Sequence, residues 1–383
     1  MKYVDLSYQY NEIREEVEAK VIELMRSFRY LQGDEVRKLE ESLKKYLGVK
    51  NAIAVANGTD ALTISLLALG VSVGDEVITT PFTFFATTES IIRVGAIPVF
   101  VDIDPETYTI DVNQIEKRIT KHTKAIMPVH IFGNVCDMKA IEAIAKKHGL
   151  FVIEDACQAI GSELNGKKAG SFSDAACFSF FLTKNLGAMG EGGMICTNND
   201  SLAVLAKALR NHGAGKDGKS AFDIEIKHKN EELDACFEEK YCHYVLGFNS
   251  RMDEIQAGIL NIKMKHINEW NDIRNKNAER YKDVISGKYK TQKIQEDSRT
   301  NYHIFSIEID NRNEIKKKLH NLGIETGIHY PIPIHLQPAL EYLGHSMGDY
   351  PVSEALASCE LSLPIYPGLK QRDIEEIATI LNG

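Results

Sequence analysis

The sequence lacks the signals of a secreted, membrane-spanning or nucleic-acid-binding protein. The N-terminal stretch MKYVDLSYQYNEIREEVEAK contains no apolar segment that could serve as a signal peptide. No run of about 18 apolar residues occurs, so no membrane-spanning helix is expected. The formal net charge of −9 comes without a basic stripe, which disfavours a nucleic-acid backbone as a partner. These absences predict a cytoplasmic protein.

Three common site signatures are also missing. The seven cysteines include no CxxC pair, so no metal is expected, and their scattered positions in apolar surroundings predict reduced thiols. No GxGxxG follows the first predicted strand, and no GxxxxGK(S/T) occurs in the chain. A dinucleotide-binding fold and a P-loop are therefore not supported.

The sequence does contain an alternation of short apolar runs and helical patterns. Helices are predicted over 13–28 and 34–47, and the runs that follow indicate strands. These runs are AIAVA (52–56), EVITT (76–80), IPVFVDI (97–103), KAIMPVH (124–130), LFVIED (150–155), ACFSF (176–180) and GGMICT (192–197). The alternation predicts an α/β fold with a mostly parallel central sheet flanked by helices. Ligands of such sheets bind beyond the carboxyl ends of the strands, so a site is expected in the loops there.

The pattern changes after residue 199. A polar, charged segment occupies 212–247, and one long amphipathic helix is expected after the turn GFNSR. Beyond it, the apolar runs HIFSIEI and HYPIPIH alternate with helices expected at 313–322 and 371–381. This arrangement predicts a smaller C-terminal α+β domain.

Two of the strand-end loops carry candidate polar residues. Gly58 and Thr59 in NGTDAL lie where a strand ends and a helix begins, a position that binds anions. The alternative is a plain helix cap by Asn57 or Thr59. Asp155 in EDACQA ends a buried strand and needs a cationic partner, with Gln158 on the same rim. The alternative is a helix cap by Asp155.

Two further loops add a lysine and an aromatic side chain. Ser179 can bond a phosphate, and Lys184 lies in a glycine-rich turn, where a lysine can form a Schiff base with an aldehyde. The alternative is an exposed loop lysine. Phe84 can stack on a ring, unless Phe82, Phe84 and Phe85 all belong to the core. A phosphate-binding loop, a buried aspartate, a stacking aromatic and a lysine together indicate pyridoxal 5'-phosphate.

Along nearly its whole length the sequence resembles the DegT/StrS sugar aminotransferases, which are fold type I pyridoxal phosphate enzymes. The resemblance is carried by NGTDAL, PFTFFAT, VDIDPETYTID, KAIMPVHIFG, EDACQAIGS, FSFFLTKNLGAMGEGG, GFNSRMDEIQA, HYPIPIH and LSLPIYP. It implies an N-terminal segment and a large cofactor-binding domain over 1–245, followed by a linking helix and a small C-terminal domain over 246–383.

The resemblance also implies roles for the residues around the reacting atoms. Lys184 is implied to be the Schiff-base lysine and the proton shuttle. Asp155 is implied to pair with the pyridine nitrogen, and Gln158 to bond the ring hydroxyl. His329 and Tyr330 match the turn that borders the sugar pocket in the family.

Further roles concern the phosphate and the subunit interface. By resemblance, Gly58, Thr59 and Ser179 hold the phosphate, and Phe84 takes the place of the stacking aromatic. Asn249 looks like the family residue that reaches the phosphate of the neighbouring subunit, which implies a homodimer with shared active sites. The segment 212–247 looks longer than in the family and is expected near the substrate entrance or the dimer interface. Cys157, where the family often has alanine, is interpreted as a packing residue.

The activity implied is transfer of an amino group from L-glutamate to a nucleotide-linked keto sugar. The segments TPFTFFATTESI, VDIDPETYTID and TKNLGAMGEGG look closer to members that act on 3-keto sugars. This favours C3 of a dTDP-3-keto-6-deoxyhexose, giving a 3-amino-3,6-dideoxy sugar for a glycan such as lipopolysaccharide O-antigen. UDP-linked 3-keto sugars, 4-keto-6-deoxy sugars and a non-catalytic sensor of the same fold stay open. A dehydratase is disfavoured, because Lys184 stands where those relatives have histidine.

Overall fold

A seven-stranded sheet forms the centre of the computed structural model, which describes residues 1–225, 241–285 and 287–383. Its strand order is β1-β9-β8-β5-β4-β2-β3. The strands are β1 (Asn51–Val55), β2 (Glu76–Thr79), β3 (Ile97–Phe100), β4 (Thr123–Ile126), β5 (Phe151–Asp155), β8 (Ala175–Ser179) and β9 (Gly193–Thr197). Strand β9 runs antiparallel to both neighbours, and the other neighbouring pairs are parallel. Each strand falls on a run that the sequence predicted, so the mostly parallel sheet is confirmed.

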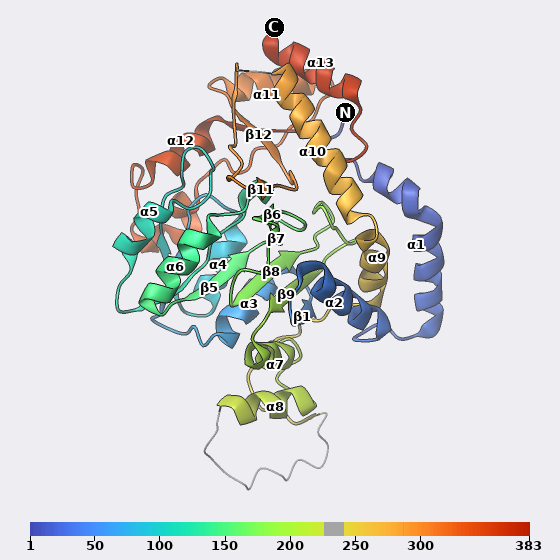
Figure 1. Ribbon diagram of the computed structural model, residues 1–383, viewed down its shortest axis with the longest axis vertical. Coiled ribbons are helices and arrows are strands. Elements are labelled where there is room, and N and C mark those ends of the chain that lie inside the picture. The colour runs from blue at the N-terminus through green and yellow to red at the C-terminus, as the bar shows by residue number, and fades with distance from the viewer. Residues whose placement is uncertain (226–240, 286) are drawn as a thin grey trace.

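Helices cover both faces of this sheet (Figure 1). One face packs against α3 (Gly58–Ala68), α4 (Phe85–Arg93) and α7 (Asp200–Leu209). The other face packs against α2 (Asp34–Leu47), α6 (Met138–His148) and α9 (Glu254–Met264). Successive side chains of a strand point to opposite faces of the sheet, so Ile53 packs on the α3 side and Ala54 on the α2 side.

The C-terminal part adds a second, smaller layer of helices and strands, drawn at the top of Figure 1. Its three-stranded sheet has the order β10-β12-β13, and a further small sheet, β11-β6-β7, joins this part to the loop after β5. The strands are β6 (Glu163–Leu164), β7 (Lys167–Lys168), β10 (Lys290–Thr291), β11 (Ser298–Arg299), β12 (Phe305–Glu308) and β13 (Glu360–Leu363). The remaining helices are α1 (Ser7–Ser27), α5 (Val112–Ile115), α8 (Gly215–Glu225), α10 (Ile267–Val284), α11 (Arg312–Asn321), α12 (Pro351–Cys359) and α13 (Gln371–Asn382).

Two sequence expectations for the C-terminal part are wrong. The single long helix after GFNSR is two helices, because the N–H groups of Lys265 and His266 bond carbonyls three residues back and tighten the turn between α9 and α10. The apolar run HYPIPIH forms no strand and contains a short 3₁₀ turn, and β12 pairs with β13. The helices predicted at 313–322 and 371–381 are confirmed as α11 and α13.

The long segment 212–247 is described only in part. Its first half forms helix α8, which Figure 1 shows at the end of the molecule opposite the C-terminal helices. Residues 226–240 lie outside the described residues, so the expected position of the whole segment stays a prediction. The division at residue 245 into two domains also stays a prediction.

The cysteines depart from the prediction at one position. Five are free, at positions 136, 157, 177, 196 and 359. Cys242 is disulfide-bonded, so the expectation of seven reduced thiols is wrong there. A bridge depends on the separation and direction of two side chains in space, which sequence spacing does not give. Cys236 lies outside the described residues.

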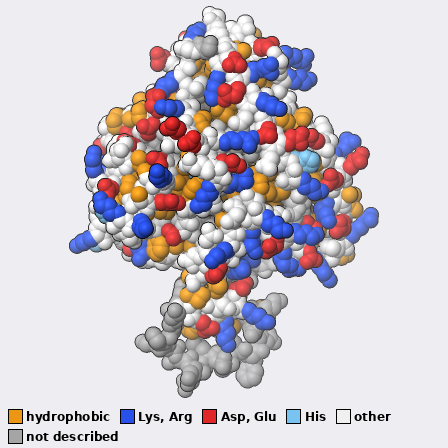
Figure 2. Space-filling view, viewed as in Figure 1, with side chains coloured by type: hydrophobic (Ala, Val, Ile, Leu, Met, Phe, Trp, Pro, Cys, Tyr) orange, Lys and Arg blue, Asp and Glu red, His pale blue; other side chains and the backbone are white. Residues whose placement is uncertain are grey.

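The surface carries charged side chains of both signs, and the helices are those of a chain without long apolar runs. Lysine and arginine side chains are interspersed with aspartate and glutamate over the face in Figure 2. Among the helices of the described residues, none combines the length and apolar character needed to cross a bilayer.

The start of α2 depends on a residue far away in the sequence. The residue before α2 is Gly33, which has no side chain to cap the helix. The Glu254 carboxylate, at the start of α9, accepts the backbone N–H groups of Gly33 (2.6 Å), Glu35 (2.9 Å) and Val36 (3.1 Å). These are orphan donors of the first helical turn, so Glu254 satisfies them and also places a negative charge at the positive end of the helix.

We predict that Glu254→Gln lowers the free energy of unfolding by about 1–3 kcal/mol, because an amide cannot accept all three N–H groups as a carboxylate does. The measurement is the urea midpoint followed by circular dichroism. Glu41→Gln is the matched control, since Glu41 lies on α2, the helix that Glu254 caps, in an exposed ion pair with Lys44. Its effect should stay within about 0.5 kcal/mol. Equal shifts of the urea midpoint in both variants would show that the cap by Glu254 does not stabilise the fold more than a surface ion pair does.

Candidate active site

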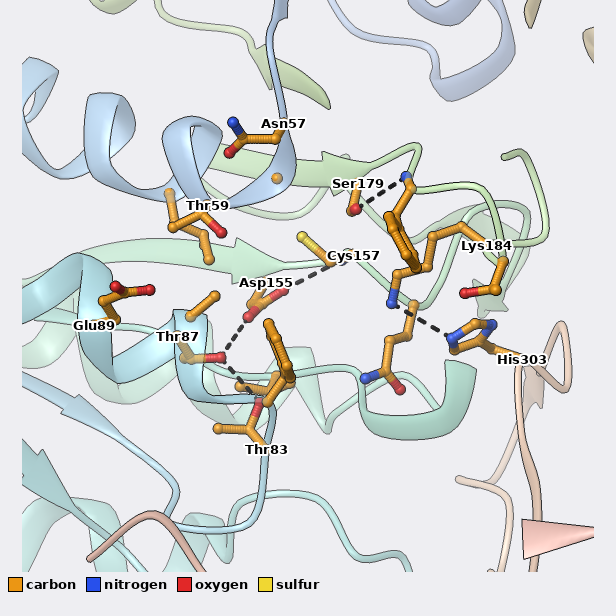
Figure 3. Close-up of a pocket in the computed structure, with 18 of the residues that line it drawn as sticks. Asn57, Thr59, Thr83, Thr87, Glu89, Asp155, Cys157, Ser179, Lys184 and His303 are labelled. Atoms are coloured by element: carbon orange, nitrogen blue, oxygen red, sulfur yellow. Dashed lines mark hydrogen bonds between the residues drawn. The ribbon is translucent and has the colours of Figure 1, made fainter. Parts of the chain in front are cut away.

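A cavity of about 650 Å³ lies beyond the carboxyl ends of the parallel strands. Four strand-end loops and segments of the C-terminal part line it, and Figure 3 shows their side chains converging. Nine of the ten site residues predicted from the sequence are in its lining. They are Gly58, Thr59, Phe84, Asp155, Gln158, Ser179, Lys184, His329 and Tyr330.

The N-terminus of α3 forms one end of the cavity. Asn57 caps this helix, because its side-chain oxygen accepts the N–H of Asp60 at 2.8 Å. The capping alternative therefore holds for Asn57, and it leaves Gly58 and Thr59 in the first turn. A Cβ atom on Gly58 would lie 2.7 Å from the Cβ of Ser179 and 3.0 Å from the Cys157 sulfur. Glycine is thus required where α3 meets β8, in a cradle suited to an anion.

Asp155 lies at the end of β5 with its carboxylate toward the cavity (Figure 3). The side chain is almost wholly buried. One oxygen accepts the hydroxyl of Thr87 at 2.7 Å, and the other accepts the N–H of Cys157 at 3.2 Å. Thr87 in turn lies 2.9 Å from the hydroxyl of Thr83. The helix-cap alternative does not apply, since no helix follows β5 within the loop. A buried carboxylate held only by neutral donors is suited to a cationic ligand.

Gln158 and two aromatic rings form the next wall. The Gln158 oxygen accepts the N–H of Phe132 at 2.7 Å, and its amide nitrogen donates to the Tyr330 hydroxyl at 3.2 Å. Phe84 is 57% exposed and its ring centre lies 6.0 Å from that of Tyr330. Phe82 is buried and Phe85 packs partly buried against the core, whereas Phe84 is exposed. The alternative that all three phenylalanines belong to the core is therefore wrong for Phe84.

His329 enters the wall from the C-terminal part. Its backbone N–H donates to the Glu360 carboxylate at 2.6 Å, and its ring Nδ1 lies 2.8 Å from the hydroxyl oxygen of Ser362. The ring also stacks on Tyr3, with 5.6 Å between the ring centres. Burial lowers the pKa of His329 to about 4, so this imidazole is neutral at neutral pH.

Lys184 lies in the loop between β8 and β9. Its backbone N–H donates to the carbonyl of Phe181 at 2.8 Å, and its Nζ lies 3.4 Å from Nε2 of His303. Burial lowers the pKa of Lys184, although Cys157 and Asp155 act in the opposite direction. A lowered pKa increases the fraction of neutral amine, which is the nucleophilic form. Because Lys184 is half-buried and lines the cavity, the exposed-loop alternative is wrong for it.

The sequence did not identify His303, Thr87 or Thr83 as site residues. His303 is 119 positions from Lys184 and begins an apolar run, so no local pattern marks it. Thr87 lies inside α4, where threonine has many structural uses. Cys157 borders the cavity, and burial raises the pKa of its thiol, which agrees with its interpretation as a packing residue.

Asn249 is the one predicted site residue that the single chain does not bring to the cavity. It is exposed, and its backbone forms an antiparallel bridge with Asn211 next to α8. The expected role of Asn249 toward a neighbouring subunit stays a prediction.

The chain is similar to known proteins over nearly its full length. The model of the DegT/DnrJ/EryC1/StrS aminotransferase family matches residues 11–382. The pleiotropic regulatory protein of Geobacillus stearothermophilus is 45% identical, over 98% of this chain and 97% of its own. A UDP-N-acetyl-3-dehydro-alpha-D-glucosamine 3-aminotransferase of Acidithiobacillus ferrooxidans is 39% identical, over 99% and 96%. A dTDP-3-amino-3,6-dideoxy-alpha-D-galactopyranose transaminase of Aneurinibacillus thermoaerophilus is 38% identical, over 100% and 97%.

Solved structures share the fold. DesV of S. venezuelae, in complex with a ketimine intermediate, superposes with a TM-score of 0.91 at 34% identity, covering 99% of this chain and 96% of its own. NtdA of Bacillus subtilis with bound cofactor PMP superposes with a TM-score of 0.83 at 33% identity, covering 97% and 83%.

We predict that apoprotein captures pyridoxal phosphate through Lys184 with a pH midpoint below the ordinary lysine value of about 10.4, because burial lowers the pKa of the amine. The measurement is the rate of borohydride-trapped adduct at Lys184 against pH, by mass spectrometry, with acetyl-lysine amide as the reference amine. Asp155→Asn should move the midpoint to still lower pH, since the carboxylate favours the ammonium. A midpoint equal to that of the reference amine would contradict the burial argument.

Proposed function

The chain belongs to the DegT/DnrJ/EryC1/StrS aminotransferase family, and from this we propose that it transfers an amino group from L-glutamate to C3 of a dTDP-linked 3-keto-6-deoxyhexose. Pyridoxal 5'-phosphate is its cofactor, and the enzyme is an aminotransferase. The proposed product is a dTDP-3-amino-3,6-dideoxyhexose for glycan biosynthesis.

The observation that carries the proposal is the placement of Lys184 and Asp155 in one cavity with the N-terminus of α3. Gly58 lets the start of α3 approach Ser179 and Cys157 too closely for a Cβ atom, and Thr59 and Ser179 line the same cavity with hydroxyl groups. The carboxylate of Asp155 lacks a positive partner among the described ion pairs, as a residue facing a pyridinium should. These residues therefore fit pyridoxal phosphate.

Each of these residues has a separate chemical task. When bound, the cofactor supplies an electron sink that stabilises negative charge at the carbon losing its proton. We assign to Asp155 the retention of the proton on the ring nitrogen, and to Gln158 a hydrogen bond to the ring hydroxyl. Lys184 would bind the cofactor aldehyde, and its free amine would act as the general acid and base at the substrate carbon. Phe84 covers the ring.

Amination at C3 is supported by the names of two relatives. The 39% identical enzyme is named for a 3-dehydro sugar linked to UDP, and the 38% identical enzyme for a 3-amino sugar linked to dTDP. These names agree on the carbon and differ in the nucleotide. The loop sequences PFTFFAT and TKNLGAMGEGG look closer to members that act on 3-keto sugars, so they support the carbon. The name of the 38% identical enzyme supports dTDP and a 3,6-dideoxy sugar, which we favour. A UDP-linked 3-keto sugar and a 4-keto-6-deoxy sugar are the alternatives.

A sensor of the same fold is the second candidate, since the 45% identical relative carries the name of a regulatory protein. A sensor needs to bind the cofactor or the sugar but has no use for a reactive amine. The side chains that the chemistry requires are present and converge in this chain. This favours turnover.

We also propose a homodimer with shared active sites. Three exposed apolar side chains lie near the cavity, at Phe181, Met189 and Phe248. Phe181 lines the cavity, and Met189 is on the same loop. Phe248 lies two residues before Ser250, whose hydroxyl donates to Asp60 of the lining. Phe248 directly precedes Asn249, so a partner that covers these side chains would bring Asn249 of one subunit toward the cavity of the other.

We predict that the protein, supplied with pyridoxal phosphate and L-glutamate, converts a dTDP-3-keto-6-deoxyhexose to the 3-amino sugar. Its kcat/KM should exceed that for UDP-linked 3-keto and dTDP-linked 4-keto sugars by about tenfold or more. The measurement is product mass and amount by liquid chromatography and mass spectrometry. L-Glutamate alone should change the visible absorbance of the bound cofactor.

Lys184→Ala is the variant that should lose this activity, by about 10³-fold or more, because it removes both the aldehyde-binding amine and the proton carrier. Lys139→Ala, at an exposed position of α6, is the matched control and should leave kcat unchanged. A higher rate on a UDP-linked sugar would replace the proposed nucleotide. Bound cofactor without any response to amino donors would favour the sensor.

We predict that Asn249→Ala weakens cofactor binding and that the loss is complemented across subunits. In a mixed dimer of Lys184→Ala and Asn249→Ala chains, one of the two sites regains both intact residues if Asn249 acts in trans. An equal, fully exchanged mixture should then recover about one quarter of wild-type activity, whereas neither variant alone does so. Absence of recovery after demonstrated subunit exchange would place Asn249 outside the partner's site.

A further inference from the structure

We propose that His303 is the positioning residue for Lys184, and that its Nε2 accepts a hydrogen bond from the lysine amine whenever the amine is free of the cofactor. This inference rests on the proposed function, because it concerns the residue that carries the proton there. The two side chains come from opposite parts of the chain, and Figure 3 shows them meeting at the cavity wall.

The hydrogen-bond network determines which nitrogen of His303 carries the proton. Asn185 donates its two amide hydrogens to the side-chain oxygen of Asn271 (2.9 Å) and the carbonyl of Asn301 (3.0 Å). Its own side-chain oxygen therefore faces Nδ1 of His303, at 3.1 Å. Because that oxygen can only accept, Nδ1 carries the hydrogen. Nε2 is left with a lone pair that points toward Lys184 Nζ at 3.4 Å.

The same network holds the histidine in position. The backbone N–H of His303 donates to the side-chain oxygen of Asn301 at 3.0 Å. Asn301 in turn donates to the carbonyls of Gln158 and Ile160, each at 3.0 Å. The histidine is thus tied to the loop that follows β5, which carries the other predicted cofactor residues. Asn185, Asn271 and Asn301 are all buried, where only fully bonded amides are tolerated.

Burial and nearby positive charges keep the His303 imidazole neutral, so that its Nε2 can accept a hydrogen bond. Lys184, Arg274 and His329 face it, and Lys184 and Arg274 are cations. Burial first, and then the charge of Lys184, hold the pKa of His303 well below its usual range. A neutral imidazole with a fixed tautomer offers Lys184 one acceptor in one direction.

This arrangement gives the free amine a defined position. A lysine side chain has four rotatable bonds and loses much rotamer freedom when it is fixed. Without an acceptor at the cavity wall, the released amine would sample several directions. The hydrogen bond to Nε2 limits it to the region between His303 and Asp155, where the reacting atoms are expected.

The test uses two amide variants that imitate opposite halves of the imidazole. His303→Gln places its amide near the Nε2 position and retains an acceptor for Lys184. His303→Asn places its amide near the Nδ1 position, so it keeps the donor to Asn185 and loses the acceptor. A positioning role predicts that the Gln variant stays within about threefold of wild-type kcat. The Asn variant should lose about 10- to 100-fold in kcat, with a KM for L-glutamate within about threefold of wild type.

A second readout does not depend on aminotransferase turnover. The pH midpoint for capture of pyridoxal phosphate by Lys184 in the apoprotein should fall in the Asn variant, by about one pH unit, because the ammonium loses its acceptor. In the Gln variant it should stay near the wild-type value. If the proposed substrates prove inactive but these midpoints behave as expected, the proposed reaction fails and the role of His303 stands.

Equal midpoints in the Asn and Gln variants would overturn the proposal and leave His303 a packing residue. Should the Asn variant fail to fold, Asn185→Ala gives the same test from the other side. It frees the imidazole to carry its hydrogen on Nε2, so the capture midpoint should again fall. An unchanged midpoint in Asn185→Ala would equally overturn the proposal.

Discussion

The Asp155 carboxylate is buried at the end of β5, among neutral hydroxyl and amide donors. A buried negative charge costs free energy unless a cation lies beside it, and the rest of the site is arranged around this requirement. The parallel strands bring four loops to the same edge, which supplies an anion cradle on one side of the carboxylate and an amine on the other. A ring with a cationic nitrogen, a phosphate and an aldehyde matches the carboxylate, the anion cradle and the amine.

Helix α9 connects this site to the outer layers. Its first residue, Glu254, caps α2, and the side chains of Gln256 and Lys263 hold the loop that carries Lys184. Lys263 donates to the carbonyl of Gly187 at 2.6 Å, and burial lowers the pKa of this lysine to about 8. A buried ammonium beside a backbone carbonyl is maintained only where the loop is well fixed. The glycine-rich turn after Lys184 is thus held by helix contacts despite its composition.

Local patterns predicted the strands, and strand ends predicted the residues near them, such as Asp155 and Lys184. These predictions succeeded because the carboxyl ends of parallel strands lie at the same edge of the sheet, so residues that follow the strands are neighbours in space. Partners from distant segments could not be predicted, because a hydrogen bond such as that between Lys184 and His303 leaves no periodic trace in the sequence. The disulfide at Cys242 was missed for the same reason. The break at His266 was missed because no glycine or proline stands at the turn between the two helices. Asn249 does not line the cavity of its own chain, and its role toward a second chain stays a prediction.

The two walls of the cavity differ in chemical character. The large sheet contributes helix N–H groups, hydroxyls and one carboxylate, which suit a charged cofactor. The C-terminal part contributes His303 and His329, both neutral because of burial. Ser362 donates its hydrogen to Glu360, so its oxygen accepts from Nδ1 of His329. Nε2 of His329 is therefore an acceptor, as in His303. Acceptors are what sugar hydroxyl groups require. The lysine amine lies where the two walls meet, which is the position that the proposed proton transfer requires.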